Sequence, residues 1–388
     1  MRVLVISNDV TPGFGVPVAA PGIRAAGLTA GLQAHGHDVG MTVPKPVLDR
    51  VWTRPTPPSP PTGVSVVDPT DLRTFIEQRR PEIVVFTNAN MIPHLAPVEG
   101  VRFVFDMFAP KILELLSSGR TDRDWAADAT RKERAMALAD HVFVNGRRKL
   151  GYALGWLLRP SVQRIRTEQF GKPALIDRDP MRHLSLVEMP VPFPTGIELP
   201  AEHRTTDGTL RIGNAGYAQA WSVLSTEEPT QQLPLTLGHE LHVLAPKHWG
   251  GSDDGNRAPL PRGVVSHDGP LDYPTFARWI QSMDVIADYF EQSAERHMAM
   301  ITRSAVALRF GVPVIHGVDS EISDMVREAD AGWVVAPGDV DGWTAAINAA
   351  ADPEQLAHKR AGARRLSLER FAPDAALAEA ATALSSLP

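Results

Sequence analysis

The chain has 388 residues, 43% of them hydrophobic and 22% charged, which is ordinary for a globular protein of about two or three domains. The net charge of −6 argues against a nucleic-acid partner, and the absence of cysteine excludes disulfides, thiolate metal sites and cysteine nucleophiles. The start, MRVLVISNDV, does not have the pattern of a signal peptide, and no window reaches the roughly 20 apolar residues of a transmembrane segment, so we expect a cytoplasmic protein.

Strand-like apolar runs alternate with helical segments in the first half of the chain, a pattern typical of a parallel α/β sheet. A buried strand at 2–7 precedes a helix over 23–36, in which Ile23, Leu28 and Leu32 have helical spacing. The proline-rich stretch 44–61 is expected to be a surface excursion without regular helix or central strand. Further strands are predicted at 37–43, 63–67, 82–87, 101–106 and 141–144.

A second α/β series follows the polar linker 200–209. We therefore predict two facing, doubly wound Rossmann-like domains: an N-terminal acceptor-binding domain over 1–200 and a C-terminal nucleotide-sugar-binding domain over 208–365. The C-terminal helix over 366–388 either packs on the second domain or crosses back to the first. The strands of the second series are predicted at 209–216, 240–246, 263–269, 283–290, 312–317 and 331–337.

The segment 288–317 carries the most informative chemistry of the second series. A loop with Glu295, Arg296 and His297 is predicted to lead into a helix that begins near Met300. The free N–H groups and positive dipole end of such a helix suit a diphosphate. The local pattern also fits an ordinary helix on whose surface Glu295 pairs with Arg303, and the residues alone leave both interpretations open.

Two strings in this half, ERHMAMITRSAVALRFGVPVIHG and SEISDMVREADAGWVVAPGD, resemble the donor-binding half of family 4-like GT-B glycosyltransferases. They are similar to a bacterial branch in which a Glu-Arg pair precedes a Thr-Arg helix start and a "GxPV" strand. The first half agrees, because PGIRAAGLTAGLQAHGHDV resembles the "GPGIR" loop, helix and strand of that branch. Segments 103–116, 145–158 and 186–193 resemble later parts in the same order.

The resemblance implies a hexosyltransferase that uses a UDP-, GDP- or dTDP-linked sugar, retains anomeric configuration and needs no metal or other cofactor. It implies catalytic roles for Asp106 and Glu295. The resemblance also implies that the following residues bind the donor: Gly213, Asn214, Gly216, Gly269, Leu271, Arg296, His297, Met298, Ala299, Met300, Thr302 and Arg303. The N-terminal cleft loop corresponds to Gly13, Gly15, Gly22 and Arg24, with Arg24 opening a helix that faces the cleft.

Several of these residues also fit plainer roles. Asp106 is either a general base or hydroxyl partner at a strand end, or the cap of the helix that follows. The glycine-rich turn 213–216 either contacts phosphate or is a simple tight turn. His239 and His242 would point to opposite faces of a strand, which excludes a zinc site there. The GFG and PGIR sequences do not form a nicotinamide fingerprint.

The sequence departs from the family at the Glu-x7-Glu motif, whose two positions are Met298 and Val306 here. This loss keeps a second class of function open, a non-catalytic pseudo-glycosyltransferase that activates a partner. A GT-B nucleotide-sugar epimerase or a phosphorylase is the alternative among enzymes. The sequence does not identify the acceptor, which could be a polysaccharide, a glycolipid or a secondary metabolite, and a homodimer is compatible with it.

Overall fold

The computed structural model of the protein describes residues 1–56, 58–117, 122–176, 178–201, 208–215, 229–244, 260, 262–267 and 271–385. Its contacts divide the chain into two compact units, one of 1–192 with 373–388 and one of 193–372. The sequence placed the end of the first domain at 200 and the last helix at 366. The contacts place these boundaries eight residues earlier and seven residues later, at 192 and 373, and the last helix belongs to the first unit.

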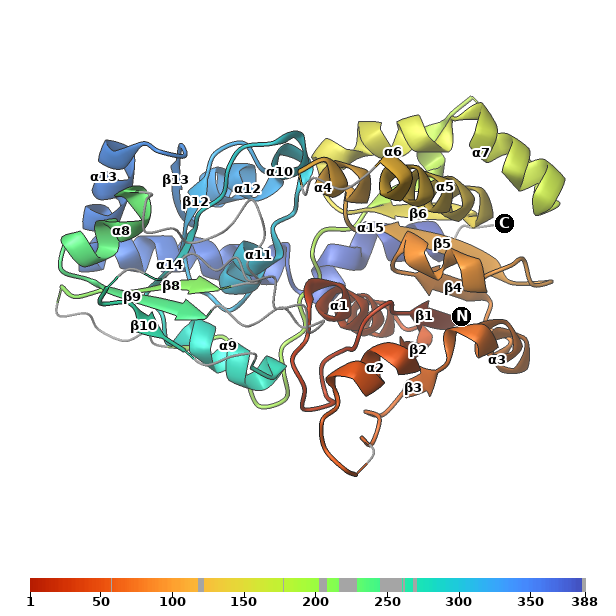
Figure 1. Cartoon of the computed structure of the whole chain (residues 1–388), viewed down its shortest axis with the longest axis horizontal. Coiled ribbons are helices and arrows are strands. Elements are labelled where there is room, and N and C mark those ends of the chain that lie inside the picture. Colours follow the sequence, from red (N-terminus) through yellow and green to blue (C-terminus); the bar gives the residue numbers. More distant parts are fainter. Residues whose placement is uncertain are drawn as a thin grey trace. The chain divides into compact units, whose positions relative to one another are not determined.

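The first unit is built on a seven-stranded parallel sheet in the order β3-β2-β1-β4-β5-β6-β7. Figure 1 labels β1 to β6 of this sheet. Both faces of its central strands are buried, which explains their near-continuous apolar sequences. The sequence did not predict β7, whose three residues are too few for a clear pattern. The strands are β1 (Arg2–Ile6), β2 (Asp38–Pro44), β3 (Val64–Val67), β4 (Ile83–Phe86), β5 (Arg102–Met107), β6 (His141–Val144) and β7 (Leu184–Leu186).

Helices cover both faces of this sheet (Figure 1). On one face, Leu28 of α1 and Leu377 of α15 pack over β1 and its neighbours, while α3, α5 and α6 cover the other face. The helices are α1 (Ala20–Ala34), α2 (Lys45–Val51), α3 (Leu72–Arg79), α4 (Lys111–Ser117), α5 (Asp122–Leu138), α6 (Leu150–Leu157), α7 (Pro160–Arg164) and α15 (Pro373–Ser385). Short turns of other helix types lie at Pro69–Asp71, Ala89–His94, Arg147–Lys149, Ile165–Gln169 and Pro180–His183.

The prediction that the proline-rich stretch after β2 contains no regular helix was wrong. Residues 45–51 form the regular helix α2, although the sequence indicated no helix between 44 and 61. Pro46 lies in the first turn of α2, where the missing N–H of proline has no intrahelical partner to lose. The prediction was wrong because it treated proline as a helix breaker regardless of its position.

The second unit has a six-stranded parallel sheet in the order β10-β9-β8-β11-β12-β13. Its core includes Trp343, which stacks on Tyr289 with ring centroids 4.4 Å apart. The strands are β8 (Arg211–Ala215), β9 (Glu240–Leu244), β10 (Val265–Ser266), β11 (Val285–Asp288), β12 (Val314–Gly317) and β13 (Gly332–Val335). The helices are α8 (Pro229–Thr236), α9 (Tyr273–Gln281), α10 (Ala294–Met298), α11 (Thr302–Arg309), α12 (Glu321–Ala329), α13 (Val340–Ala351) and α14 (Pro353–Glu369).

Each sheet has one point at which the strand order reverses. In the first unit this point lies between β1 and β4, and in the second between β8 and β11. Open α/β sheets bind ligands outside the carboxyl ends of the strands at such a switch point. The residues that follow β1, β4, β8 and β11 are therefore the first place to look for function.

Candidate functional site

In the second unit, a helix start lies close to the carboxyl end of the sheet. The N-cap of α11 is Ile301, which supplies no side-chain hydrogen bond, and the first turn contains no acidic residue. The N–H groups of this turn therefore lack the usual capping oxygen, as expected of a helix end that binds an anion. The sequence placed this start near Met300, and the structure places it at Thr302, with Ala299 and Met300 buried in the connection.

Arg303 brings positive charge to the switch point between β8 and β11. Its Nη1 donates to the carbonyl oxygen of Ala215 at 3.0 Å, and its Nε lies 3.1 Å from Oδ1 of Asp288. The side chain is 13% exposed. The surface pair between Glu295 and Arg303 that the local pattern also allowed is not formed, because Glu295 pairs with Arg296. Arg303 thus lies in the first turn of α11, where we expect the diphosphate.

A buried polar network supports this arrangement, and the sequence analysis missed it. Ser304 donates to Asp288 and also lies 3.0 Å from Nδ1 of His316. The other ring nitrogen of His316 lies 2.8 Å from Oγ of Ser320. Burial raises the pKa of Asp288, but Arg303, His316 and Ser304 outweigh it and hold that pKa below its ordinary value. Asp288 is therefore a stable anion beneath α11.

The order Ser320, His316, Asp288 resembles a hydrolytic triad, but these three side chains have no exposed surface. Ser320 Oγ already accepts the N–H of Ser323 at 3.0 Å as the cap of α12. A substrate could not reach this oxygen, so the network is structural. Its signal in the sequence was the presence of Asp288 and His316 inside otherwise apolar strands.

The Glu-Arg pair lies in α10, a short helix where the sequence predicted a loop. Ser293 caps α10 by accepting the N–H of Arg296 at 3.1 Å. Glu295 and Arg296 form a buried ion pair with each other. His297 Nδ1 lies 2.7 Å from Oδ1 of the exposed Asp319. A role for Glu295 toward sugar hydroxyls would have to compete with its own arginine.

In the described part of the glycine-rich turn, Gly213 and Asn214 contribute to the packing and pairing of strands. A Cβ atom on Gly213 would lie 2.6 Å from Cδ1 of Ile286, so this glycine makes room for core packing between β8 and β11. Asn214 Nδ2 donates to the carbonyl oxygen of Ala287 at 2.9 Å and ties the same two strands. Gly216 and Gly269 lie outside the described residues, and the half-buried Leu271 follows Gly269 closely.

In the first unit, two predicted cleft residues form an internal ion pair. Nε and Nη2 of Arg24 donate to the two carboxylate oxygens of Asp106 at 2.7 and 2.6 Å, and neither side chain has exposed surface. Arg24 Nη1 also donates to the carbonyl oxygen of Glu188 at 2.7 Å. Arg24 therefore faces the interior of its unit, and that the helix it opens faces the cleft stays a prediction. A carboxylate that accepts two guanidinium bonds and has no exposed surface is poorly placed to act as a base.

In the predicted N-terminal cleft loop, the backbone conformation and close packing require glycine at three positions. Gly13 and Gly15 have φ angles of 106° and 67°, which favour glycine. A Cβ atom on Gly22 would lie 1.9 Å from the carbonyl oxygen of Val10, so only glycine lets α1 pack this closely on the loop. These positions fix the path of the chain between β1 and α1.

Near the start of the same connection, three residues after the end of β1, lies Asp9, a residue that the sequence analysis did not select. Ser7 Oγ accepts the N–H of Asp9 at 3.1 Å and donates to its carbonyl oxygen at 2.7 Å, which fixes the backbone. Beside it, Thr87 after β4 donates its N–H to the carbonyl oxygen of Ile6 at 3.1 Å. Asp9 is thus a carboxyl group at the carboxyl end of β1, next to the switch point.

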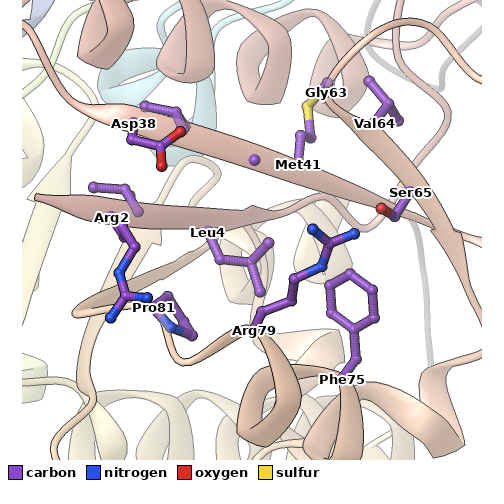
Figure 2. A pocket seen from close by; sticks show the side chains of 13 residues that line it. Arg2, Leu4, Asp38, Met41, Gly63, Val64, Ser65, Phe75, Arg79 and Pro81 are labelled. Atoms are coloured by element: carbon purple, nitrogen blue, oxygen red, sulfur yellow. The ribbon is translucent and has the colours of Figure 1, made fainter.

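A hollow of about 540 Å³ lies at the opposite, amino ends of β1 and β2 (Figure 2). Gly40 and Gly63 are among the residues that line it. Phe75 and Arg79 of α3 line one side, as Figure 2 shows. It is far along the strands from the ends at which α/β sheets bind ligands. We therefore do not place the functional site there.

The described ranges contain no group of three or more metal-ligating side chains. Both ring nitrogens of His242 contact protein groups, Glu240 and His267, at 2.8 and 2.9 Å. No helix in the described part of the chain is long and apolar enough to cross a membrane.

The sequence matches no family model and no curated protein. Among solved structures, it is similar to sucrose-phosphate synthase from Thermosynechococcus elongatus, with 13% identity, a TM-score of 0.65 and coverage of 100% of this chain and 98% of that one. Anabaena HepE in complex with UDP-glucose has 13% identity, a TM-score of 0.58 and full coverage of both chains. Starch synthase IV from Arabidopsis thaliana, bound to ADP and acarbose, has 13% identity, a TM-score of 0.57 and coverage of 100% and 98%. These likenesses and the two parallel sheets show that the chain has the GT-B fold of Rossmann-like units.

Proposed function

We propose that this protein is a glycosyltransferase that moves a hexosyl group from a nucleoside-diphosphate sugar to an acceptor hydroxyl. The observation that carries the proposal is the start of α11 at the β8 and β11 switch point. This start has no side-chain cap, and its second residue is Arg303. Helix N–H groups and a guanidinium together suit a diphosphate. The complexes of HepE with UDP-glucose and of starch synthase IV with ADP, on the same fold, support a nucleotide donor.

In this proposal the second unit stabilises the leaving nucleoside diphosphate, where negative charge develops as the glycosidic carbon–oxygen bond breaks. The N–H groups of Thr302 and its neighbours supply fixed positive partial charge, and Arg303 and Arg296, which pair with Asp288 and Glu295, add guanidinium donors. The reaction requires no resident metal or cofactor and retains anomeric configuration, as the sequence resemblance implies. We propose that it takes place in the cytoplasm and that the first unit binds the acceptor.

A second candidate is a non-catalytic homologue that binds a nucleotide and activates a partner. It is favoured by Val306, which is buried in α11 at a position where the family resemblance implies a carboxylate. Binding without turnover would distinguish this candidate from the enzyme.

Turnover tests the proposal directly. We expect the protein to release UDP, GDP or dTDP from one class of nucleotide sugar, faster when a mixture of polysaccharide, glycolipid and small-molecule hydroxyl acceptors is present. Coupled detection of the nucleoside diphosphate measures this rate, and NMR of the product gives its anomeric configuration. An epimerase would convert the donor without any acceptor. A protein that binds a nucleotide but consumes no donor would contradict the transferase and favour the activating homologue.

A further inference from the structure

The hollow at the amino ends of β1 and β2 has no part in the proposed glycosyl transfer, but it has the size of a small-molecule site. Its volume is about 540 Å³, and ligand pockets in proteins have roughly 300–1,000 Å³. It lies on the face of the sheet that α3 covers, because Leu4 in its lining belongs to the core beneath that helix (Figure 2). The side chains around it decide which ligand it could bind, whatever reaction the protein catalyses.

Gly40 keeps the floor of this hollow open, although neither its backbone nor the described residues around it require glycine. It lies inside β2, paired with Leu4 of β1, and its φ angle is outside the left-handed region that favours glycine. Among the described residues, a Cβ atom on Gly40 would meet only Cδ1 of Leu4, at 3.8 Å, which is ordinary van der Waals contact. Glycine weakens the interior of a strand and often marks a place where a ligand approaches closely. The space over Gly40 is therefore open to a ligand.

Helix α3 brings a planar cation to one side of the hollow. Phe75 and Arg79 are four residues apart on this helix, and Cζ of Arg79 lies 5.3 Å from the centroid of the Phe75 ring. Figure 2 shows Arg79 extending from α3 toward the strands, between Leu4 and Phe75. Arg79 has no carboxylate partner in the described part of the chain. Its N–H groups can therefore donate to an anion in the hollow.

The charges around the hollow favour a ligand with a single negative charge. Arg2 also lines the hollow, and within the described ranges its side chain forms no ion pair. Asp38, an exposed carboxylate at the start of β2, lines it as well. The two guanidinium groups attract an anion, whereas Asp38 repels further negative charge such as that of a phosphate group. The lining thus suits a carboxylate better than a phosphate.

We propose that this hollow binds a small aromatic monocarboxylate. The ring lies over Gly40 against Leu4 and Phe75, where its apolar area is removed from water. The carboxylate accepts hydrogen bonds from the guanidinium of Arg79, and the hydroxyl of the half-buried Ser65 in the lining is a second donor. Because the hollow is at the opposite end of β1 from the switch point, it is a second ligand site of the protein.

Three probes test the chemistry of this site. 2-Naphthoate is the aromatic carboxylate, 2-naphthalenemethanol is its uncharged analogue, and inorganic phosphate is an anion without a ring. Isothermal titration calorimetry and saturation-transfer NMR at pH 7 measure their binding. We expect 2-naphthoate to bind the wild type with a Kd below about 1 mM, and the other two to bind at least about 10-fold more weakly. Equal binding of the alcohol or of phosphate would contradict an aromatic monocarboxylate as the ligand.

Two variants and two matched controls test the location. Gly40→Val places a branched side chain in the hollow and should weaken 2-naphthoate by about 10-fold or more. It should fold, because the space beside Gly40 is open and valine suits a strand. Arg79→Gln should weaken 2-naphthoate by about 10-fold and leave the alcohol unchanged. Two controls should bind like the wild type: Gly151→Ala, at an exposed glycine of α6, and Arg73→Gln, on α3 but outside the lining of the hollow.

Two results would overturn the site. One is the absence of 2-naphthoate binding to the wild type up to about 5 mM. The other is unchanged binding in folded Gly40→Val and Arg79→Gln, and Arg79→Gln decides alone if Gly40→Val does not fold. These measurements need neither a sugar donor nor an acceptor, so their failure would leave the proposed glycosyltransferase standing.

Discussion

Replacing Asp106 with alanine should lower the free energy of unfolding by about 3–5 kcal/mol, because it leaves Arg24 charged and unpaired in the interior of the first unit. The guanidinium would keep only its bonds to the main-chain carbonyl groups of Glu188 and Val187. Chemical denaturation followed by circular dichroism measures this loss. We expect it to exceed that of most single substitutions in the chain.

Two comparisons separate this effect from general damage. Glu77→Ala breaks the exposed ion pair with Arg73 on α3 and should change the unfolding free energy by less than about 1 kcal/mol. The double variant Arg24→Met with Asp106→Leu removes both charges and should recover much of the stability lost by Asp106→Ala. If Asp106→Ala unfolds at the wild-type denaturant concentration, the buried pair does not exist as described.

Replacing Asp288 with alanine should cost the second unit about 3 kcal/mol, because Arg303, Ser304 and His316 lose a shared buried partner. The pKa of Asp288 lies below its ordinary value in the folded protein. Its carboxylate therefore stabilises the fold above the pKa of an unfolded aspartate, and this contribution is lost as the pH falls through the folded value. The difference between wild type and Asp288→Ala should be constant near neutral pH and shrink below about pH 4.

Unfolding curves at pH 7, 4 and 3 test this dependence. Asp324→Ala, which breaks an exposed pair with Arg327 on α12, provides a control in the same unit and should have a small effect at every pH. An Asp288→Ala penalty that stays the same at pH 3 would show that the carboxylate contributes by packing and not by charge.

Most of the fold could be predicted from the sequence, and there is a physical reason for this. Strands of a parallel sheet are buried on both faces, so β1, β4 and β11 have apolar runs that a single sequence reveals. The shortest elements could not be predicted, because β7 and α10 have too few residues to show a hydrophobic period. The helix α2 was hidden by prolines that a first turn tolerates.

Only those parts of the candidate site that depend on neighbouring residues in the chain could be predicted from the sequence. The start of α11 follows from helix-end chemistry, so the sequence could place Arg303 in its first turn, while its role in donor binding stays a prediction. The partner of Arg24 could not, because Asp106 lies 82 positions away and the pair forms only when α1 packs against β5. The fixed carboxyl of Asp9 depends on a loop conformation that no residue pattern reports. Long-range pairs and loop geometry are thus the part that required a structure.

Binding of a nucleoside diphosphate to the second unit tests the central claim most directly. Isothermal titration calorimetry would compare UDP, GDP and dTDP on the wild type, Arg303→Ala and the exposed control Arg327→Ala. We predict that one of the three binds the wild type and Arg327→Ala equally, and that Arg303→Ala weakens it by about 10-fold or more, as the loss of a charged hydrogen bond implies. No binding by any nucleoside diphosphate, or equal binding by folded Arg303→Ala, would contradict the donor site at α11.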